Sequence, residues 1–241
     1  MGLLSKLWEK RHELYALPST IYFNFRNLPF HQAKKLPIIL YHAKILGKGK
    51  YRIEGEVRTG MIQLGYPYVS IFKEKGIIVE NKGLIVFKGK VSIGANSGIS
   101  VGKTGVLTFN DKFSNSYGLK VVCYKKITFD YGVRIGWDTL VCDTDFHSMK
   151  TEDGKHHTKG YGEISLGKEV WVGSYCKLYK NTSVPDRCTV ASNTLLNKKI
   201  ECEPYSLIYS GGGIKIKYTG YYRDINDDKI NYEGEEAGKL S

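Results

Sequence analysis

The 241-residue sequence predicts an all-β fold, a parallel β-helix of hexapeptide repeats with a short N-terminal helix and one extruded loop. The first observation is an aliphatic residue at every sixth position, namely Leu166, Val172, Leu178, Val184, Val190 and Leu196. The second is a small residue four positions after each of the first five, namely Val170, Cys176, Thr182, Cys188 and Thr194. The third is that neither the i, i+3, i+4 spacing of a helix nor the turn signals of hairpins occur in this stretch.

A period of six is typical of a coil in which each unit contributes one short strand and one corner. Three units complete a coil, the aliphatic residue points inward, and the small residue fits a corner where a larger side chain would collide. Because successive coils stack, the inward residues are expected to form continuous ladders that bury one another.

The period continues upstream with shifts of two residues, from Ile99 to Val101, from Leu107 to Phe109 and from Ile127 to Phe129. We interpret these shifts as corners of altered length. The β-helix is predicted to span residues 51–220, with weaker periodicity over 52–86, and residues 221–241 predict an acidic, disordered tail.

Residues 1–50 predict a helical or irregular cap, with a short amphipathic helix over 3–16. Such a helix would cover the strand edges of the first coil. The alternative is contact with a membrane surface, which Lys6, Lys10 and Arg11 favour.

The formal net charge of +12 would suit nucleic acid, anionic lipid or a phosphorylated cofactor. No zinc-finger, RNP or helix-turn-helix pattern accompanies it, so no nucleic-acid partner is predicted. No run of roughly 20 apolar residues and no secretory signal pattern occurs, so we expect a cytoplasmic protein, with the inner face of the membrane as the alternative. The five cysteines form no CxxC pair, which favours buried, reduced thiols over a zinc or redox site.

One segment interrupts the repeat between Val141 and Ile164, and we expect residues 143–163 to leave the prism as a loop. Long loops within a compact repeat are usually functional. This one contains three of the six histidines, namely His147, His156 and His157.

The chain resembles the hexapeptide-repeat O-acetyltransferases over residues 85–220, in the run LGKEVWVGSYCKLYKNTSVPDRCTVASNTLLNKK, with TDFH upstream and SGGGIKIK downstream. The DTDFH loop and Trp171 look most like the members that modify capsule and lipopolysaccharide sugars, and FNFRNLPFHQAKKLP also looks like that group. The resemblance implies a left-handed coil, which is exceptional among parallel crossovers. It also implies a homotrimer with active sites between subunits, acetyl-CoA as co-substrate and no metal.

In this family the histidine at the position of His147 is the general base. A sugar hydroxyl is a weak nucleophile near neutral pH, and a histidine can take its proton and pass it to the departing thiolate. Asp143 and Asp145 flank it, and either could orient the imidazole or instead shape an Asx turn. The family's asparagine on the preceding coil falls at Tyr117 by counting back, with Asn115 and Ser116 beside it.

We therefore expect substrate contacts at Asn115, Tyr117 and His156, with a solvated loop position as the alternative for His156. The resemblance implies that acetyl-CoA runs along the outside of the coils, against main-chain groups at Ser174 and Ser192. The remaining expected contacts are Trp171, Asn197, Lys198 and Lys215, with Lys217 beside the last of these. The alternatives are ordinary surface charge for the lysines and trimer packing for Trp171.

The predicted function is transfer of acetyl from acetyl-CoA to a sugar hydroxyl of a bacterial surface polysaccharide or its precursor. One alternative is N-acetylation of an amino sugar or nucleotide sugar, and another is a non-catalytic trimeric scaffold. A carbonic-anhydrase-like zinc site is disfavoured, because the three loop histidines include an adjacent pair, His156 and His157, with poor geometry for one ion.

Overall fold

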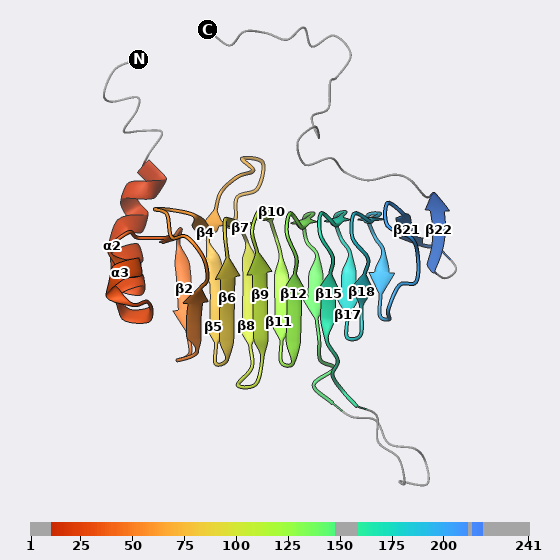
Figure 1. Cartoon of the computed structure of the whole chain (residues 1–241). Coiled ribbons are helices and arrows are strands. Elements are labelled where there is room, and N and C mark those ends of the chain that lie inside the picture. The colour runs from red at the N-terminus through yellow and green to blue at the C-terminus, as the bar shows by residue number, and fades with distance from the viewer. Residues whose placement is uncertain (1–10, 148–158, 212–213, 219–241) are drawn as a thin grey trace, which may run out of the picture.

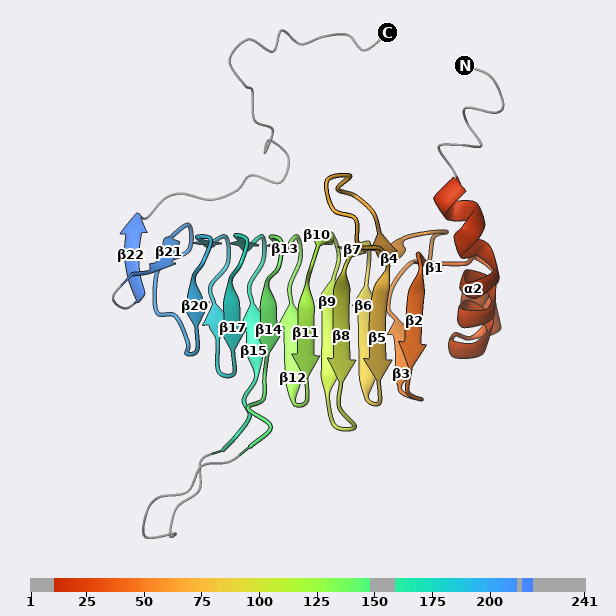
Figure 2. The ribbon, with the colours of Figure 1, turned by 180° about the vertical axis from the view of Figure 1, so that it is seen from behind.

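The structure is a computed structural model that describes residues 11–147, 159–211 and 214–218, with the main chain only at 11–14 and 214–218. Three sheets form the sides of a triangular prism, and helices cover its N-terminal end (Figure 1). The chain advances from left to right in Figure 1, where the strands facing the viewer run upward. Seen from behind in Figure 2, the strands in front run downward. The coil is therefore left-handed, and the predicted fold class is confirmed.

Strands of successive coils pair in parallel within each sheet, and only β22 of the described strands runs antiparallel to its neighbour. The first sheet contains β1 (Ile38–Leu40), β4 (Ile62–Tyr66), β7 (Val91–Ala95), β10 (Phe113–Tyr117), β13 (Arg134–Ile135), β16 (Trp171–Val172), β19 (Thr189–Val190), β21 (Leu207–Ser210) and β22 (Ile214–Tyr218). The second sheet contains β2 (Ala43–Leu46), β5 (Ile77–Asn81), β8 (Ser97–Val101), β11 (Lys120–Cys123), β14 (Leu140–Cys142), β17 (Lys177–Tyr179) and β20 (Leu195–Leu196). The third sheet contains β3 (Lys50–Ile53), β6 (Leu84–Lys88), β9 (Val106–Asn110), β12 (Lys126–Phe129), β15 (Ile164–Leu166) and β18 (Ser183–Val184).

The hexapeptide period is realised as predicted in the C-terminal coils. Trp171 pairs with Thr189, so a coil there takes 189 − 171 = 18 residues, or three units of six. The aliphatic and small positions of the repeat are all buried. The residue before each small one has a positive φ, between 57° and 67°, at Glu169, Tyr175, Asn181, Arg187 and Asn193. This left-handed backbone conformation turns the chain at each corner.

The interpretation of the two-residue shifts as altered corners is wrong. Ile99 and Val101 lie on the same strand, β8, and both are buried. Leu107 and Phe109 likewise share β9. Because alternate residues of a strand share a face, a longer strand presents two inward residues, and the period slips by two.

These longer strands hold an aromatic ladder inside the third sheet. The ring of Phe109 lies between those of Phe87 and Phe129, with centroids 5.8 and 5.2 Å away. Phe113 meets Phe109 edge-on at 4.7 Å. Stacked aromatic rings fill the wider upstream coils, where hexapeptide aliphatic residues alone would leave space.

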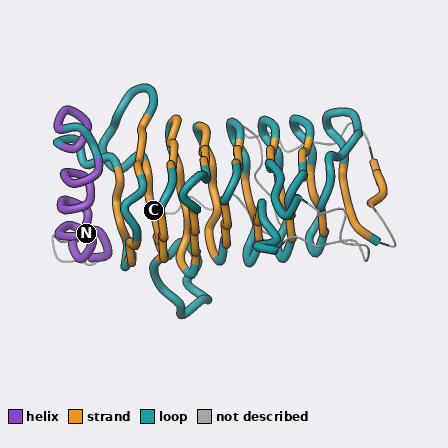
Figure 3. Tube along the Cα trace, turned by 90° about the horizontal axis from the view of Figure 1, so that it is seen from below, coloured by secondary structure: helices purple, strands orange, loops and turns teal. Residues whose placement is uncertain are grey.

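The N-terminal cap consists of α2 (Arg11–Asn27) and α3 (Phe30–Ala33), which lie across one end of the prism (Figure 3). The helix therefore extends well beyond the expected end at residue 16. Two of its polar side chains bind the edge strand β1. Leu40 N donates to Thr20 Oγ1 at 3.0 Å, and Asn24 Nδ2 donates to Ile38 O at 2.7 Å. The cap thus satisfies main-chain groups that the first coil would otherwise expose.

The coil already begins at β1, ahead of the expected start at residue 51. A segment over 67–76, between β4 and β5, protrudes from the prism beside the first sheet (Figure 1) and was not predicted. None of the described helices is long and apolar enough to span a membrane. The expected tail at 221–241 and the expected helix over 3–10 lie outside the described residues.

The five cysteines are free thiols, and four of them are buried. Burial raises the pKa of Cys123, Cys142 and Cys176, and raises that of Cys188 to about 12. The nearest pair is Cys188 and Cys202, whose sulfurs are 3.8 Å apart. These thiols therefore behave as small core residues, as the sequence suggests.

Truncation of the aromatic ladder should be the most damaging change to the core. Phe109→Ala removes a fully buried ring between two others, and we expect it to lower the free energy of unfolding by about 3 to 5 kcal/mol. Urea denaturation, monitored by circular dichroism, measures this free energy of unfolding. The matched control is Ile78→Ala on the outer face of β5, which should stay within about 0.5 kcal/mol of the parent. Equal losses of unfolding free energy in the two variants would contradict a stabilising role for the aromatic ladder.

Candidate functional site

The extruded loop leaves the prism through a fixed neck. Thr144 and Tyr161 form an antiparallel bridge. Asp145 N donates to Gly160 O at 2.7 Å, and Gly162 N donates to Asp143 O at 2.9 Å. His147 follows this neck directly and is exposed. The predicted base is therefore anchored to the scaffold through the residues before it, while His156 and the loop tip lie outside the described residues.

Asp143 is a structural carboxylate. It is fully buried, and its two oxygens accept hydrogen bonds from three main-chain N–H groups of the preceding coil. The donors are Tyr124 N at 2.7 Å, Lys125 N at 2.8 Å and Lys126 N at 2.8 Å. An anion held by converging N–H groups fixes that corner and the start of the loop together.

Asp145 lies on the outside of the neck and forms an ion pair with Lys180 on the next coil. Phe146, which has a positive φ of 60°, places its ring edge-on to Tyr124 at 5.0 Å. Among the described residues, no hydrogen bond joins either carboxylate to His147. Each aspartate thus holds a different part of the neck.

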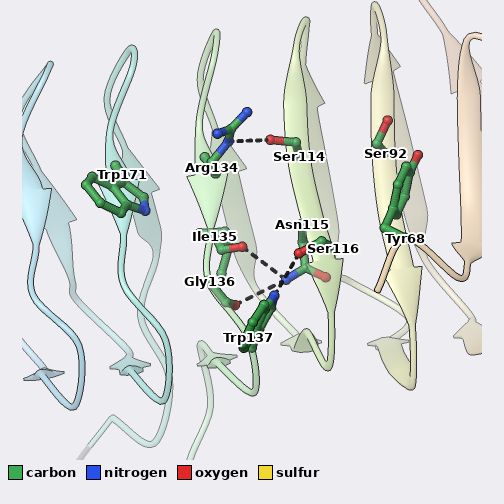
Figure 4. Close-up of a pocket in the computed structure, with 10 residues that line it drawn as sticks. All are labelled: Tyr68, Ser92, Ser114, Asn115, Ser116, Arg134, Ile135, Gly136, Trp137 and Trp171. Atoms are coloured by element: carbon green, nitrogen blue, oxygen red, sulfur yellow. Dashed lines mark hydrogen bonds between the residues drawn. The ribbon is translucent and has the colours of Figure 1, made fainter. Parts of the chain in front are cut away.

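A second feature is a groove of about 460 Å³ on the outer face of the first sheet (Figure 4). Its lining combines serine hydroxyls, one guanidinium and three aromatic rings. The residues are Tyr68, Ser92, Ser114, Asn115, Ser116, Arg134, Ile135, Gly136, Trp137 and Trp171. No sequence pattern had identified Tyr68, Arg134 or Trp137.

Strand register builds this groove from four successive coils. Ser92 pairs with Ser114, Ser114 with Arg134, and Arg134 with Trp171, so their side chains form one outward row. Arg134 Nε donates to Ser114 Oγ at 3.3 Å. Trp137 Nε1 donates to Ser116 Oγ at 2.8 Å, and Trp171 is 43% exposed. Hydroxyl groups beside aromatic faces suit a ligand that is itself polar at its edges and apolar on its faces.

The protruding segment 67–76 supports one wall of the groove. Phe72 stacks on Tyr117 with centroids 3.8 Å apart and meets Trp137 edge-on at 5.3 Å. The Tyr117 hydroxyl donates to Glu74 at 2.6 Å, and this bond is the main cause of a raised Tyr117 pKa. Tyr117, an expected substrate contact, is therefore covered and bonded within the chain.

Asn115, the other expected contact on this coil, occupies an inward ladder position between Ile93 and Ile135. Its Nδ2 donates to the main-chain oxygens of Tyr117, Ile135 and Gly136, each at 3.1 Å. The amide replaces an aliphatic side chain and holds the corner beneath the groove. Its Oδ1 accepts no hydrogen bond from a described residue.

Ser174 and Ser192 stack at the edge between the first and second sheets. Trp137 N donates to Ser174 Oγ at 3.1 Å, and Ser174 N donates to Ser192 Oγ at 3.1 Å. A second groove of about 360 Å³ lies beside this edge, lined by Asp138, Tyr175, Lys177, Asn193, Thr194 and Leu195. The predicted coenzyme contacts Ser174 and Ser192 are not among these lining residues, but they directly precede Tyr175 and Asn193, which are.

The other predicted coenzyme residues lie elsewhere on the chain. Asn197 and Lys198 are exposed and follow β20, at the edge between the second and third sheets where the extruded loop also leaves. Lys215 lies on β22, and its side chain is outside the described residues. Within the described ranges, no three His, Cys, Asp or Glu side chains gather closely enough to hold a metal ion.

One chain does not bring His147 and the groove together. The first sheet forms the upper side of the prism in Figure 1, and the extruded loop leaves from the opposite, lower edge. The outward row of Ser92, Ser114 and Arg134 could have been found by counting back one coil at a time. The protruding segment that completes the groove has no such period.

No protein-family model and no curated protein sequence matches the chain. Among solved structures, the polySia-specific acetyltransferase NeuO is 15% identical, with 78% of this chain and 91% of that chain covered and a TM-score of 0.49. The polysialic acid O-acetyltransferase OatWY is 17% identical, with 79% and 94% covered and a TM-score of 0.37. AntD, an N-acyltransferase from Bacillus cereus in complex with dTDP and coenzyme A, is 11% identical, with 80% and 89% covered and a TM-score of 0.38. At these identities the likeness concerns the fold alone.

Asp143 and Asp145 should differ sharply on substitution. Asp143→Ala leaves three main-chain N–H groups without their buried acceptor, so the free energy of unfolding should fall by at least about 2 kcal/mol. Asp145→Ala removes an exposed ion pair and should cost less than about 1 kcal/mol. Urea denaturation gives both values, and hydrogen exchange at residues 124–126 should quicken only in the first variant. Unchanged exchange there would show that the carboxylate does not hold this corner.

Proposed function

We propose that the protein is an acetyl-CoA-dependent O-acetyltransferase that acts on a sugar hydroxyl of a bacterial surface polysaccharide or its precursor. The observation that carries the proposal is His147. It lies in the DTDFH sequence that resembles the sugar O-acetyltransferases, directly after a rigid neck that projects from a left-handed β-helix. An exposed imidazole on a fixed support is suited to proton transfer with a substrate.

In the proposed reaction His147 accepts the proton of the sugar hydroxyl as the hydroxyl oxygen attacks the thioester carbonyl carbon. The carbon–sulfur bond then breaks, and the imidazolium returns the proton to the coenzyme A thiolate. The products are the acetyl ester and free coenzyme A, so atoms and charge balance. A histidine is suited to both transfers because its ordinary pKa lies near neutrality.

The groove beside Ser174 and Ser192 is the proposed place for the pantetheine arm. An extended chain of amides needs main-chain hydrogen-bonding groups along its length, and the carbonyl oxygen of Ser174, which accepts one main-chain hydrogen bond from Asn193 N, can accept a second. Lys177 in the same groove carries a charge that suits the coenzyme's phosphates. Asn197 and Lys198 lie at the neighbouring edge of the prism, beside the extruded loop, and would contact another part of the coenzyme there.

The groove on the first sheet is the proposed acceptor site. Its serine hydroxyls and the Arg134 guanidinium supply hydrogen bonds for a sugar, and Trp171 offers an exposed face for stacking. Because this groove and His147 lie on different sides of one prism, the complete site needs two chains. Three copies arranged in a ring would complete such a site if His147 of each chain faced the first-sheet groove of the next chain. This arrangement has closed symmetry.

Replacement of His147 tests the proposed base. We expect His147→Ala to bind acetyl-CoA like the parent and to lose about 10²- to 10⁴-fold in acceptor-dependent thiol release. His31→Ala, an exposed histidine in α3, should keep the parent's rate. The acceptor panel should contain neutral, acidic and amino sugars, with the product's linkage identified by mass spectrometry.

Equal thiol release from the parent and His147→Ala would exclude His147 as the base. An amide product formed only from amino sugars would favour N-acetylation instead. Failure of the parent to bind acetyl-CoA would favour a non-catalytic scaffold.

A further inference from the structure

The cap helix α2 is apolar on two opposite faces. Its inward stripe, which includes Ala16 and Phe23, packs against the first coil. On the opposite side Tyr15 is 76% exposed, Tyr22 is 63% exposed and Phe25 is 48% exposed. A surface helix normally turns a polar face to solvent, so a second apolar face indicates a second contact.

The exposed side chains form one surface at the end of the prism. Tyr15, Pro18, Tyr22 and Phe25 recur at intervals of three or four residues, so they lie on the side of α2 that faces away from the coils. Phe30 of α3 is 71% exposed, and its ring centroid is 6.0 Å from that of Phe25. Figures 1 and 3 show both helices across this end.

Basic residues predominate beside these aromatic rings. The sequence contains no Asp or Glu between Glu13 and Glu54, although 24 acidic residues occur in the whole chain. The exposed basic residues of this stretch are Arg26, Lys34, Lys35, Lys44, Lys48, Lys50 and Arg52. Glu13 lies in the first turn of α2 and Arg52 pairs with Glu54 at 3.7 Å, so the end of the prism combines aromatic side chains with a predominantly positive charge.

We infer that this aromatic and basic end, formed by α2, α3 and the first coil, binds the surface of an anionic lipid bilayer. Tyrosine and phenylalanine rings are suited to the depth of the headgroups, and lysines beside them are attracted to anionic lipid. A second copy of the chain fits less well, because two identical faces of like charge repel each other. The prism would then stand on the membrane with its axis across the bilayer plane, whether or not it transfers acetyl groups.

Co-flotation of the full chain with lipid vesicles tests this inference. The parent should float with vesicles of phosphatidylcholine and phosphatidylglycerol, should not float with phosphatidylcholine alone, and should be released as salt rises. Tyr22→Ser with Phe25→Ser should reduce the bound fraction by at least about tenfold, because it removes the rings that enter the interface. Lys34→Glu with Lys35→Glu should reduce the bound fraction to a similar extent, because it replaces two positive charges with negative charges that anionic lipid repels.

The matched control is Lys103→Glu with Lys199→Glu, which changes the net charge equally at two exposed positions on other coils. This control should bind like the parent. Equal loss in the control, or unchanged flotation of the Tyr22 and Phe25 variant, would overturn the inference. Failure of the parent to float with anionic vesicles would also overturn it. A smaller oligomer mass in solution for the Tyr22 and Phe25 variant than for the parent would likewise overturn it, because this end of the prism would then be an interface between chains.

Circular dichroism would establish that each variant keeps the parent's fold. The substituted side chains are exposed, so we expect no change in thermal unfolding.

Discussion

Main-chain hydrogen bonds between successive coils are the constraint on which the rest of the structure depends. Because Trp171 pairs with Thr189 and Val172 with Val190, each inward side chain must stack on the equivalent position of the next coil. In the C-terminal coils the corners meet this register through left-handed backbone conformations, which cost energy at residues such as Tyr175. The buried ladders offset that cost, and the result is a rigid column with straight edges.

This rigid column fixes the positions of the functional groups that its edges and faces carry. Asp143 joins the extruded loop to the coil before it, so His147 begins from a fixed point. The groove of Ser114, Arg134 and Trp171 is equally fixed, on another side of the prism. A scaffold that cannot bend to unite these two features favours a site completed by a neighbouring chain.

The hexapeptide coils could be predicted because their signal is local and periodic, as at Leu166, Val172 and Leu178. The longer strands could not be told from altered corners, because a second inward residue also shifts the period by two. The roles of Asp143 and Asp145 depend on which main-chain groups the preceding coil presents, and sequence spacing does not show this. The groove could not be predicted because segment 67–76, which forms one of its walls, follows no repeat.

Oligomers of mixed composition provide the most direct test of a site shared between chains. His147→Ala chains and Trp171→Ala chains, each with a different affinity tag, would be co-expressed and purified through both tags. In a ring of three, one site in each mixed oligomer combines an intact His147 with an intact groove, so activity should return to about a third of the parent's. Activity no higher than that of the two single-variant proteins would contradict the account.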